Sequence, residues 1–104
     1  MPRNPLLKGL KPMHPGEYLR EDVLPALGRS RTEIARLLGI SRQTLYDVLT
    51  EKQPVTANLA VRLGKLCGDG PDIWLRMQQK YDRETAEREL KDVIACIPTL
   101  HAAE

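Results

Sequence analysis

The sequence predicts an all-α fold built from five helices. Residues that favour helices dominate the 104-residue chain, and no stretch alternates polar and apolar residues with the period of a strand. The length fits a single domain. The chain contains no Phe, so its core must be built mostly from Leu, Ile, Val and Ala. It therefore has room for one helical core and not for a second domain of the kind an enzyme would need.

Two short helices joined by a tight turn are predicted between residues 31 and 52. Ser30 is placed to cap the first of them, and Glu33 follows three residues later, which is the spacing of a capping box. Three apolar residues recur at three- and four-residue steps and should share an inward face: Ile34, Leu37 and Leu38.

Gly39 should end this helix, because glycine adopts the left-handed conformation of a helix end at little cost. Ile40 would fill the corner, and Ser41 would cap the second helix. In that helix the inward residues are expected to be Leu45, Val48 and Leu49. The outward residues are expected to be Arg42, Gln43, Tyr46 and Asp47.

This pair of helices resembles a helix-turn-helix DNA-binding motif of the phage-repressor (Cro/cI-like) superfamily. The resemblance rests on two small residues and on five apolar positions: Ala35, Gly39, Ile34, Leu38, Ile40, Leu45 and Val48. Ala35 matters because the second helix would cross too close there for a larger side chain. The resemblance implies a five-helix lambda-repressor-like DNA-binding domain with an extended C-terminal helix. The alternative is a plain helical hairpin in another all-α domain.

Prolines and glycines predict the remaining helix boundaries. The first helix should begin near Pro15 and end at Leu24, because the residue before Pro25 avoids the α region. It would pack on the motif through Tyr18, Leu19 and Val23. A fourth helix should cover residues 57–66 after the cap Thr56 and end before Gly68. It would face inward through Leu59, Ala60, Leu63 and Leu66.

The fifth helix should run from Pro71 to about Ile94. The domain organisation that follows is a flexible basic N-terminal arm at residues 1–13, a domain at residues 14–97 that ends in a dimerisation helix, and a tail at residues 98–104. The basic residues of the arm could reach phosphates or belong to a solvated tail: Arg3, Lys8 and Lys11.

Two segments that flank the motif narrow the resemblance. HPGEYL at residues 14–19 and GPDIWLRMQQKYD at residues 70–82 are similar to HigA-type antitoxins, also called VapI-like transcriptional regulators. The similarity runs from His14 to about Glu89. It implies the antitoxin of a type II toxin-antitoxin system: a homodimer that binds an inverted-repeat operator in double-stranded DNA, represses its own operon and neutralises a HigB-type mRNA ribonuclease toxin.

Two other functions remain open from the sequence. One is a stand-alone phage-type helix-turn-helix regulator without a toxin partner, and the other is a protein-binding helical module that does not bind DNA. A net charge of only +2 keeps the second open. Residues 1–52 carry 9 Lys and Arg against 6 Asp and Glu, a net +3, whereas residues 53–104 carry 7 against 8, a net −1. A phosphate-binding surface therefore belongs in the first half.

The second motif helix supplies the candidate base-reading residues. The planar guanidinium of Arg42 matches the O6/N7 edge of guanine, and the amide of Gln43 can pair bidentately with adenine. Asp47 could accept from a cytosine amino group, or could form an ion pair with Arg42 or Arg31. Tyr46 could touch a thymine methyl group or a sugar, or could pack on the helix.

Four residues around these helices are candidates for phosphate contacts: Arg31, Ser41, Thr44 and Lys52. Arg31 begins the first motif helix and Lys52 follows the second, while the two hydroxyls are short and suited to phosphate oxygens. Ser41 could serve only as the helix cap, and Arg36 is expected to be surface charge.

The fifth helix is the expected dimer interface, through Met77, Tyr81 and Leu90, although these residues could instead complete the monomer core. Trp74 is assigned to the core, because a chain without Phe needs a large anchor there. A basic toxin would find complementary charge on the first helix, where the alternative is a solvated surface: Glu17, Glu21 and Asp22.

Several classes of function are excluded or disfavoured. The sequence has no nucleophile elbow, glycine-rich phosphate loop or paired catalytic carboxylates, so no enzyme is expected. Cys67 and Cys96 lack the spacing of metal ligands, and neither a metal nor any other cofactor is expected. The chain shows no signal peptide and no membrane span, which leads us to expect a soluble, cytoplasmic protein.

Overall fold

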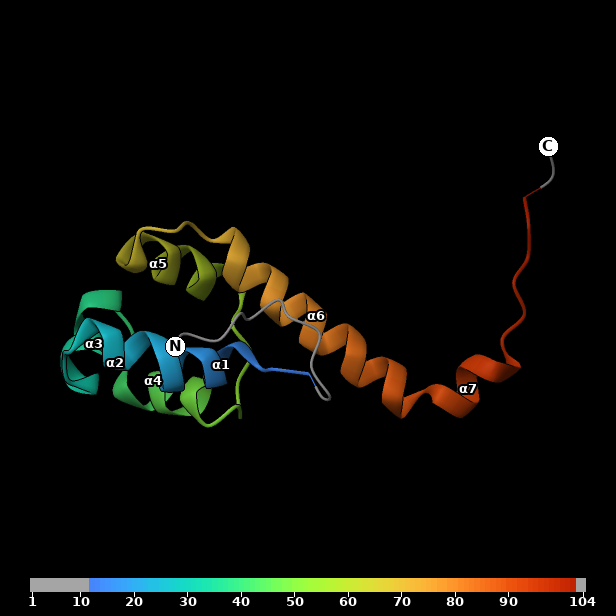
Figure 1. Cartoon of the computed structure of the whole chain (residues 1–104), viewed down its shortest axis with the longest axis horizontal. Helices are drawn as coiled ribbons and strands as arrows, with labels where there is room; N and C mark the ends of the chain where they lie inside the picture. Colours follow the sequence, from blue (N-terminus) through green and yellow to red (C-terminus); the bar gives the residue numbers. More distant parts are fainter. Residues whose placement is uncertain (1–11, 103–104) are drawn as a thin grey trace.

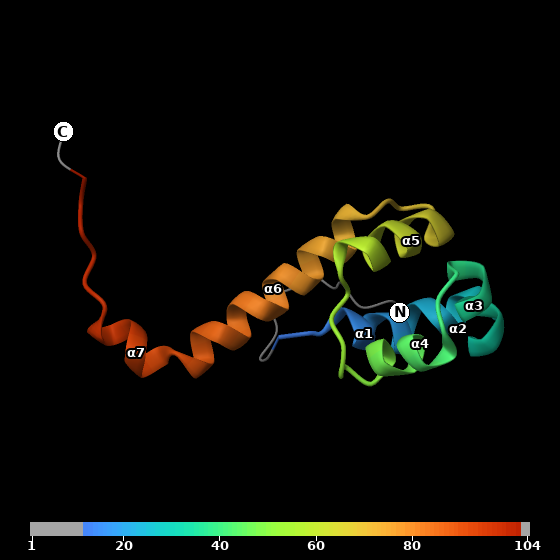
Figure 2. The ribbon, with the colours of Figure 1, turned by 180° about the vertical axis from the view of Figure 1, so that it is seen from behind.

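Helices are the regular secondary structure of residues 12–102, the part of the chain that this computed structural model describes. This confirms the predicted all-α class. A helical body holds the first helices, and the C-terminal helices extend away from it (Figures 1 and 2). The predicted arm lies almost entirely outside the described residues. No helix within residues 12–102 is both long enough and apolar enough to cross a membrane.

The first helix is longer than predicted. It is continuous through α1 (Pro15–Tyr18), η1 (Leu19–Val23) and α2 (Leu24–Leu27). The prediction that it ends at Leu24 is wrong because η1 is a π-helical turn: the N–H of Leu24 bonds to the carbonyl of Leu19, five residues back. This wider turn accommodates Pro25, which has no N–H to donate and would clash with the carbonyl of a tight helix. Gly28 then ends the helix with φ 66°.

The helix pair predicted from the sequence consists of α3 (Arg31–Leu38) and α4 (Arg42–Leu49). The Oγ of Ser30 accepts from the N–H of Glu33 at 3.1 Å. Gly39 ends α3 with φ 72°, as its sequence position predicts. Of the three residues expected to face inward from α3, Ile34 and Leu38 are buried. The prediction for Leu37 is wrong, because Leu37 is 45% exposed.

The helices that follow complete the body. Thr56 caps α5 (Ala57–Cys67) by accepting from the N–H of Leu59 at 3.2 Å, and Gly68 ends it with φ 81°. After a short turn, α6 (Asp72–Glu89) packs on α5 and on α1. Its first turns complete the core, and its later turns project beyond the body (Figure 1).

The single helix predicted from Pro71 to about Ile94 is in fact two helices. Leu90, with φ −101° and ψ 14°, ends α6 and precedes α7 (Lys91–Cys96). The described residues beyond Glu84 and Thr85 are all exposed, so this part of the chain has no neighbouring helix to hold it straight. Neither proline nor glycine lies near Leu90, and the sequence therefore gives no sign of the break.

The core lies among the helices of the body. Its buried apolar residues are Leu19, Leu24, Ile34, Ala35, Leu38, Leu45, Val48, Leu49, Val55, Leu59, Ala60, Leu63, Trp74 and Met77. Trp74 is fully buried, in agreement with its predicted place. The prediction that Met77 contributes to a dimer interface is wrong, because Met77 is 1% exposed within its own chain. Trp74 and Met77 both complete the core that the preceding helices form.

Two contacts fix α4 against the first helix. A Cβ added to Gly16 would lie 1.9 Å from the main-chain oxygen of Val48, so only glycine permits this close approach. The Nη1 of Arg20 donates to the carbonyl of Leu49 at 2.5 Å and lies 3.6 Å from the carboxylate of Glu51. Arg20 therefore binds the end of α4 through the Leu49 carbonyl and the segment after it through the Glu51 carboxylate.

Candidate nucleic-acid interface

The outward face of α4 carries polar side chains beside an open hollow of about 620 Å³. The hollow lies where the start of α3 meets the start of α4, and it is lined by Arg31, Thr32, Ser41, Arg42, Gln43, Leu45 and Tyr46. Burial of the apolar side of α4 against the core determines which side is left for a ligand. The structure thus brings most of the predicted DNA-binding residues to one surface.

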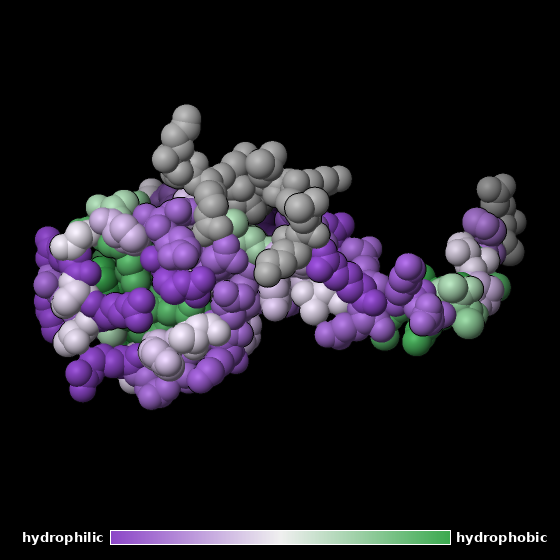
Figure 3. Space-filling model, turned by 60° about the horizontal axis from the view of Figure 1, so that its bottom comes forward, coloured by the Kyte–Doolittle hydropathy of each residue, from purple (hydrophilic) through white to green (hydrophobic). Residues whose placement is uncertain are grey.

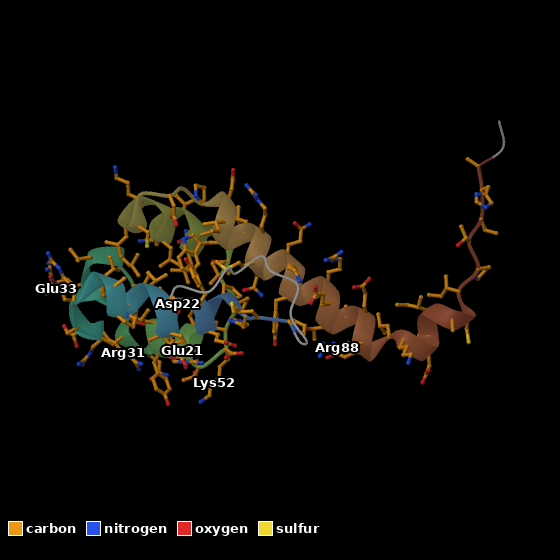
Figure 4. The ribbon with its side chains drawn as sticks, in the orientation of Figure 1. Glu21, Asp22, Arg31, Glu33, Lys52 and Arg88 are labelled. Carbon is orange, nitrogen blue, oxygen red and sulfur yellow. The ribbon has the colours of Figure 1, made fainter. Side chains whose placement is uncertain are left out.

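Positive charge on this surface is available for a ligand. Arg31 and Arg42 are exposed, and within the described chain neither guanidinium has a hydrogen-bond or ion-pair partner. Arg31 and Lys52 lie on the same side of the body, near α4 (Figure 4). A guanidinium without an internal partner keeps all its donors for an external acceptor.

The two hydroxyls at the start of α4 bond to each other. The Oγ of Ser41 accepts from the N–H of Thr44 at 3.0 Å, and the Ser41 hydroxyl donates to the Oγ1 of Thr44 at 2.8 Å. Ser41 thereby uses both its proton and one lone pair within the helix cap. Thr44 keeps its own hydroxyl proton, so it is the better placed of the two to donate to a phosphate oxygen.

Gln43 and Asp47 form a pair along α4. The Nε2 of Gln43 donates to the Oδ1 of Asp47 at 2.9 Å, at the i, i+4 spacing of neighbouring helical side chains. The alternative that Asp47 forms an ion pair with Arg42 or Arg31 is wrong, because its carboxylate bonds to Gln43. The spacing of Gln43 and Asp47 was the signal available in the sequence.

Lys52 and Tyr46 also interact. The ammonium nitrogen of Lys52 lies 5.6 Å from the centre of the Tyr46 ring, which is the geometry of a cation–π contact. The ring stays about half exposed, and the charge remains at the surface. The contact places a cation at the C-terminal end of α4, opposite the end that carries Arg42.

Sequence reasoning missed one residue of the surface. Thr32 lines the hollow together with the candidates that were predicted. Its place directly after Arg31, in the first turn of α3, was the signal that could have found it. Within residues 12–102, no group of three or more His, Cys, Asp or Glu residues is arranged to hold a metal ion.

The chain is similar to known proteins over much more than this surface. No protein-family model matches the chain. It is 35% identical over 86 residues to virulence-associated protein I of Dichelobacter nodosus, covering 83% of this chain and 80% of that protein. Antitoxin HigA of Pseudomonas aeruginosa, solved with the higBA promoter, is 32% identical with a TM-score of 0.82, over 88% of this chain and 100% of that one.

A second solved structure, antitoxin GraA in complex with its operator, is 37% identical with a TM-score of 0.82. The similarity covers 93% of this chain and 99% of that one. It therefore extends over nearly the whole chain and is not confined to the helix pair.

Proposed function

The chain belongs to the HigA family of antitoxins, and we propose that it is the antitoxin of a type II toxin-antitoxin system. In this proposal it binds an inverted-repeat operator in double-stranded DNA, represses its own operon and neutralises a HigB-type mRNA ribonuclease toxin. The observation that carries the proposal is the polar face of α4, exposed beside Arg31 and Arg42, whose guanidinium groups have no partner within residues 12–102. Membership of a family of antitoxins and transcriptional regulators agrees with the prediction that the chain is not an enzyme.

Base reading is proposed for the exposed side chains of α4. The helix would enter the major groove with its N-terminal end toward the bases. There the free guanidinium of Arg42 suits guanine, and the amide of Gln43 suits adenine. Further along the exposed face of α4, Tyr46 is proposed to contact a thymine methyl group or a sugar.

Phosphate contacts are proposed for residues that border α4. Arg31 and Lys52 would hold the two backbones on either side of the groove, because their charges lie near the two ends of the helix pair. Thr44 would donate its free hydroxyl proton to a phosphate. Ser41 is the weaker candidate, since its hydroxyl proton is already donated to Thr44.

A homodimer is proposed through the C-terminal extension, which comprises the later turns of α6, α7 and the described residues after α7. The apolar stripe consists of Leu90, Val93, Ile94 and Ile97, which lie on α7 or directly at its two ends and are between 45% and 63% exposed. Figure 3 places hydrophobic surface at the far end of this extension, beyond the hydrophilic turns of α6. Such a stripe favours burial against a second copy, which would also supply the two-fold symmetry that an inverted repeat requires.

The three residues predicted for the dimer interface differ in how far they are exposed. Met77 belongs to the core, whereas Leu90 lies on the stripe and stays in the proposal. Tyr81 is half-buried, with its ring 4.8 Å from the ring of His14 in an edge-on contact. Tyr81 is proposed to lie at the inner border of the dimer interface, where the C-terminal extension leaves the body.

Toxin binding is proposed for the acidic side of the first helix. Glu21 is exposed, and Glu17 and Asp22 are half-buried. Figure 4 shows Glu21 and Asp22 on this helix, apart from Arg88 on the extension. Negative charge there would attract a basic ribonuclease. Loss of toxin binding in the triple variant Glu17→Gln, Glu21→Gln and Asp22→Asn, with unchanged DNA binding, would support this surface, and undiminished toxin binding would eliminate it.

The test of the proposed function is co-expression with the neighbouring gene. The neighbour expressed alone should arrest growth, and co-expression with this chain should restore growth and yield a complex that co-purifies. The Arg42→Ala variant is the matched control: it should still rescue growth, because base reading and toxin binding use different surfaces. A harmless neighbour beside a chain that still binds DNA would favour the stand-alone regulator.

A further inference from the structure

We infer that Asp47 is a positioning residue whose carboxylate holds the amide of Gln43 in the orientation that reads adenine in preference to guanine. The inference rests on the proposed function, namely on DNA binding through α4. It assigns to Asp47 a role that acts through Gln43 and involves no contact with a base.

The chemistry of the pair fixes the orientation of the amide. The two side chains are 2.9 Å apart, from the Nε2 of Gln43 to the Oδ1 of Asp47. An ionised carboxylate only accepts hydrogen bonds, so it must face the NH₂ group of the amide and not its oxygen. Rotating the amide by half a turn would place Oε1 against Oδ1, where two acceptors repel.

Main-chain hydrogen bonds fix the position of Asp47. Its main-chain carbonyl accepts from the N–H of Lys52 at 2.8 Å and from the N–H of Gln53 at 3.2 Å. The hydroxyl of Thr50 lies 3.4 Å from the same oxygen. These bonds hold residue 47 through its main chain, so its side chain is not needed to form the turn that ends α4.

The groups left free on Gln43 match one base. One hydrogen of Nε2 is used by Asp47, which leaves the second hydrogen and Oε1 for the groove. Adenine offers the N7 acceptor and the N6 donor, which pair with that hydrogen and with Oε1. Guanine offers the two acceptors N7 and O6, so Oε1 would face O6 without a proton between them. An amide free to rotate would lose this distinction.

The test starts with selection of binding sites from a randomised duplex pool by the full-length wild-type protein. The position read by Gln43 is the one at which the Gln43→Ala variant loses base preference. At that position, affinities for adenine and guanine duplexes are then compared for wild type, Asp47→Asn and Asp47→Ala. Asn can present either its oxygen or its NH₂ group, so it permits both orientations of the Gln43 amide. We expect the adenine preference to fall about five- to tenfold in both variants.

Two controls separate positioning from simple charge. Asp47→Asn should bind unrelated DNA more tightly, because a negative charge near the phosphates is removed. Glu33→Gln removes one negative charge from α3, at a side chain that pairs with Arg29 and not with Gln43, and it should leave the adenine-to-guanine ratio unchanged. In the Gln43→Ala background, adding Asp47→Asn should change the ratio no further.

The outcomes distinguish the inference from the function on which it rests. A wild-type protein that selects no sequence overturns both. Selection of a sequence with an adenine preference that survives Asp47→Asn within about twofold overturns the inference alone. An effect of Asp47→Asn that persists in the Gln43→Ala background also overturns it, because Asp47 would then read a base directly.

Discussion

Arg62 of α5 donates a hydrogen bond from Nη1 to the main-chain carbonyl of Leu38 at 2.8 Å, at the end of α3. Its Nε donates to the Oδ1 of Asn58 at 2.7 Å, which orients the guanidinium along α5. The carbonyl of Leu38 is one of those that the end of a helix leaves without an intrahelical partner. Arg62 therefore holds the turn between α3 and α4 in place, and with it the start of the candidate nucleic-acid interface on α4.

Replacing Arg62 by Met keeps an apolar stem and removes both hydrogen bonds. We expect a loss of about 1–2 kcal/mol in the free energy of unfolding, because the bonds use a charged donor at a partly exposed site. Urea denaturation measures this change. Arg36→Met on α3 is the control: Arg36 is exposed and has no partner within the described chain, so the change should stay within about 0.5 kcal/mol. Equal effects of the two substitutions would contradict the role of Arg62.

Gly16→Ala tests the close approach of the first helix to α4. The new Cβ would lie 1.9 Å from the oxygen of Val48, and a main-chain atom cannot move aside as a side chain can. We expect about 3 kcal/mol of destabilisation, or no cooperative unfolding transition at all. Gly68→Ala is the control, because a Cβ there meets nothing within 4 Å and only the φ of 81° is strained, at about 1–2 kcal/mol. A smaller loss for Gly16→Ala than for Gly68→Ala would show that the helices do not meet in this way.

His14 should make the stability depend on pH. Burial lowers its pKa below the ordinary 6.5, although the carboxylates of Glu51 and Asp82 act in the opposite direction. Neutral Nδ1 accepts from the N–H of Gly16 at 2.9 Å, and protonation would remove that acceptor. The unfolded chain therefore binds the proton first, so the stabilisation is complete above about pH 6.5 and is lost as the pH falls below it.

The measurement is the melting temperature at about pH 7.5 and about pH 5.5. Wild type should melt lower at the acidic pH. His14→Asn keeps a side chain that can cap the helix without titrating in this range, so its decline should be smaller. An equal decline in both proteins would assign the pH dependence to other groups.

The proposed dimer predicts a folded monomer when the apolar stripe is made charged. Leu90→Asp with Ile94→Asp introduces two charges on residues already 45% and 47% exposed, so the monomer fold should survive. Sedimentation at micromolar concentration should change from dimer to monomer, with unchanged helix content and much weaker operator binding. The control pair is Leu37→Asp with Val61→Asp, which alters exposed apolar residues of the body. A monomer from the control pair and a dimer from the stripe variant would move the interface to the body.

Local signals in the sequence predicted most of the body. The cap at Ser41 and the left-handed turn at Gly39 depend on residues a few positions apart, so they can be recognised without knowledge of the fold. The end of the first helix could not be predicted in the same way. Pro25 usually stops a helix, and only the hydrogen bond from Leu24 to Leu19 shows how a wider turn admits it.

The sequence predicted which residues form the candidate site better than it predicted the contacts among them. The outward positions of α4 follow from helical periodicity, and they placed Arg42, Gln43 and Tyr46 on one surface with Arg31. Met77 was misplaced because an apolar stripe looks the same whether it faces the core or a second chain. Only the arrangement of the other helices decides between them, and that arrangement depends on residues distant in sequence.

Operator binding by the Arg42→Ala variant tests whether α4 reads the bases of DNA. Fluorescence anisotropy with the selected operator and with an unrelated duplex, at one fixed salt concentration, gives the ratio of the two affinities for each protein. We expect Arg42→Ala to lose about 1–3 kcal/mol of binding free energy on the operator, most of it as lost specificity, while Arg36→Ala keeps the wild-type ratio. An unchanged ratio in Arg42→Ala, beside tight binding of the operator, would contradict the claim.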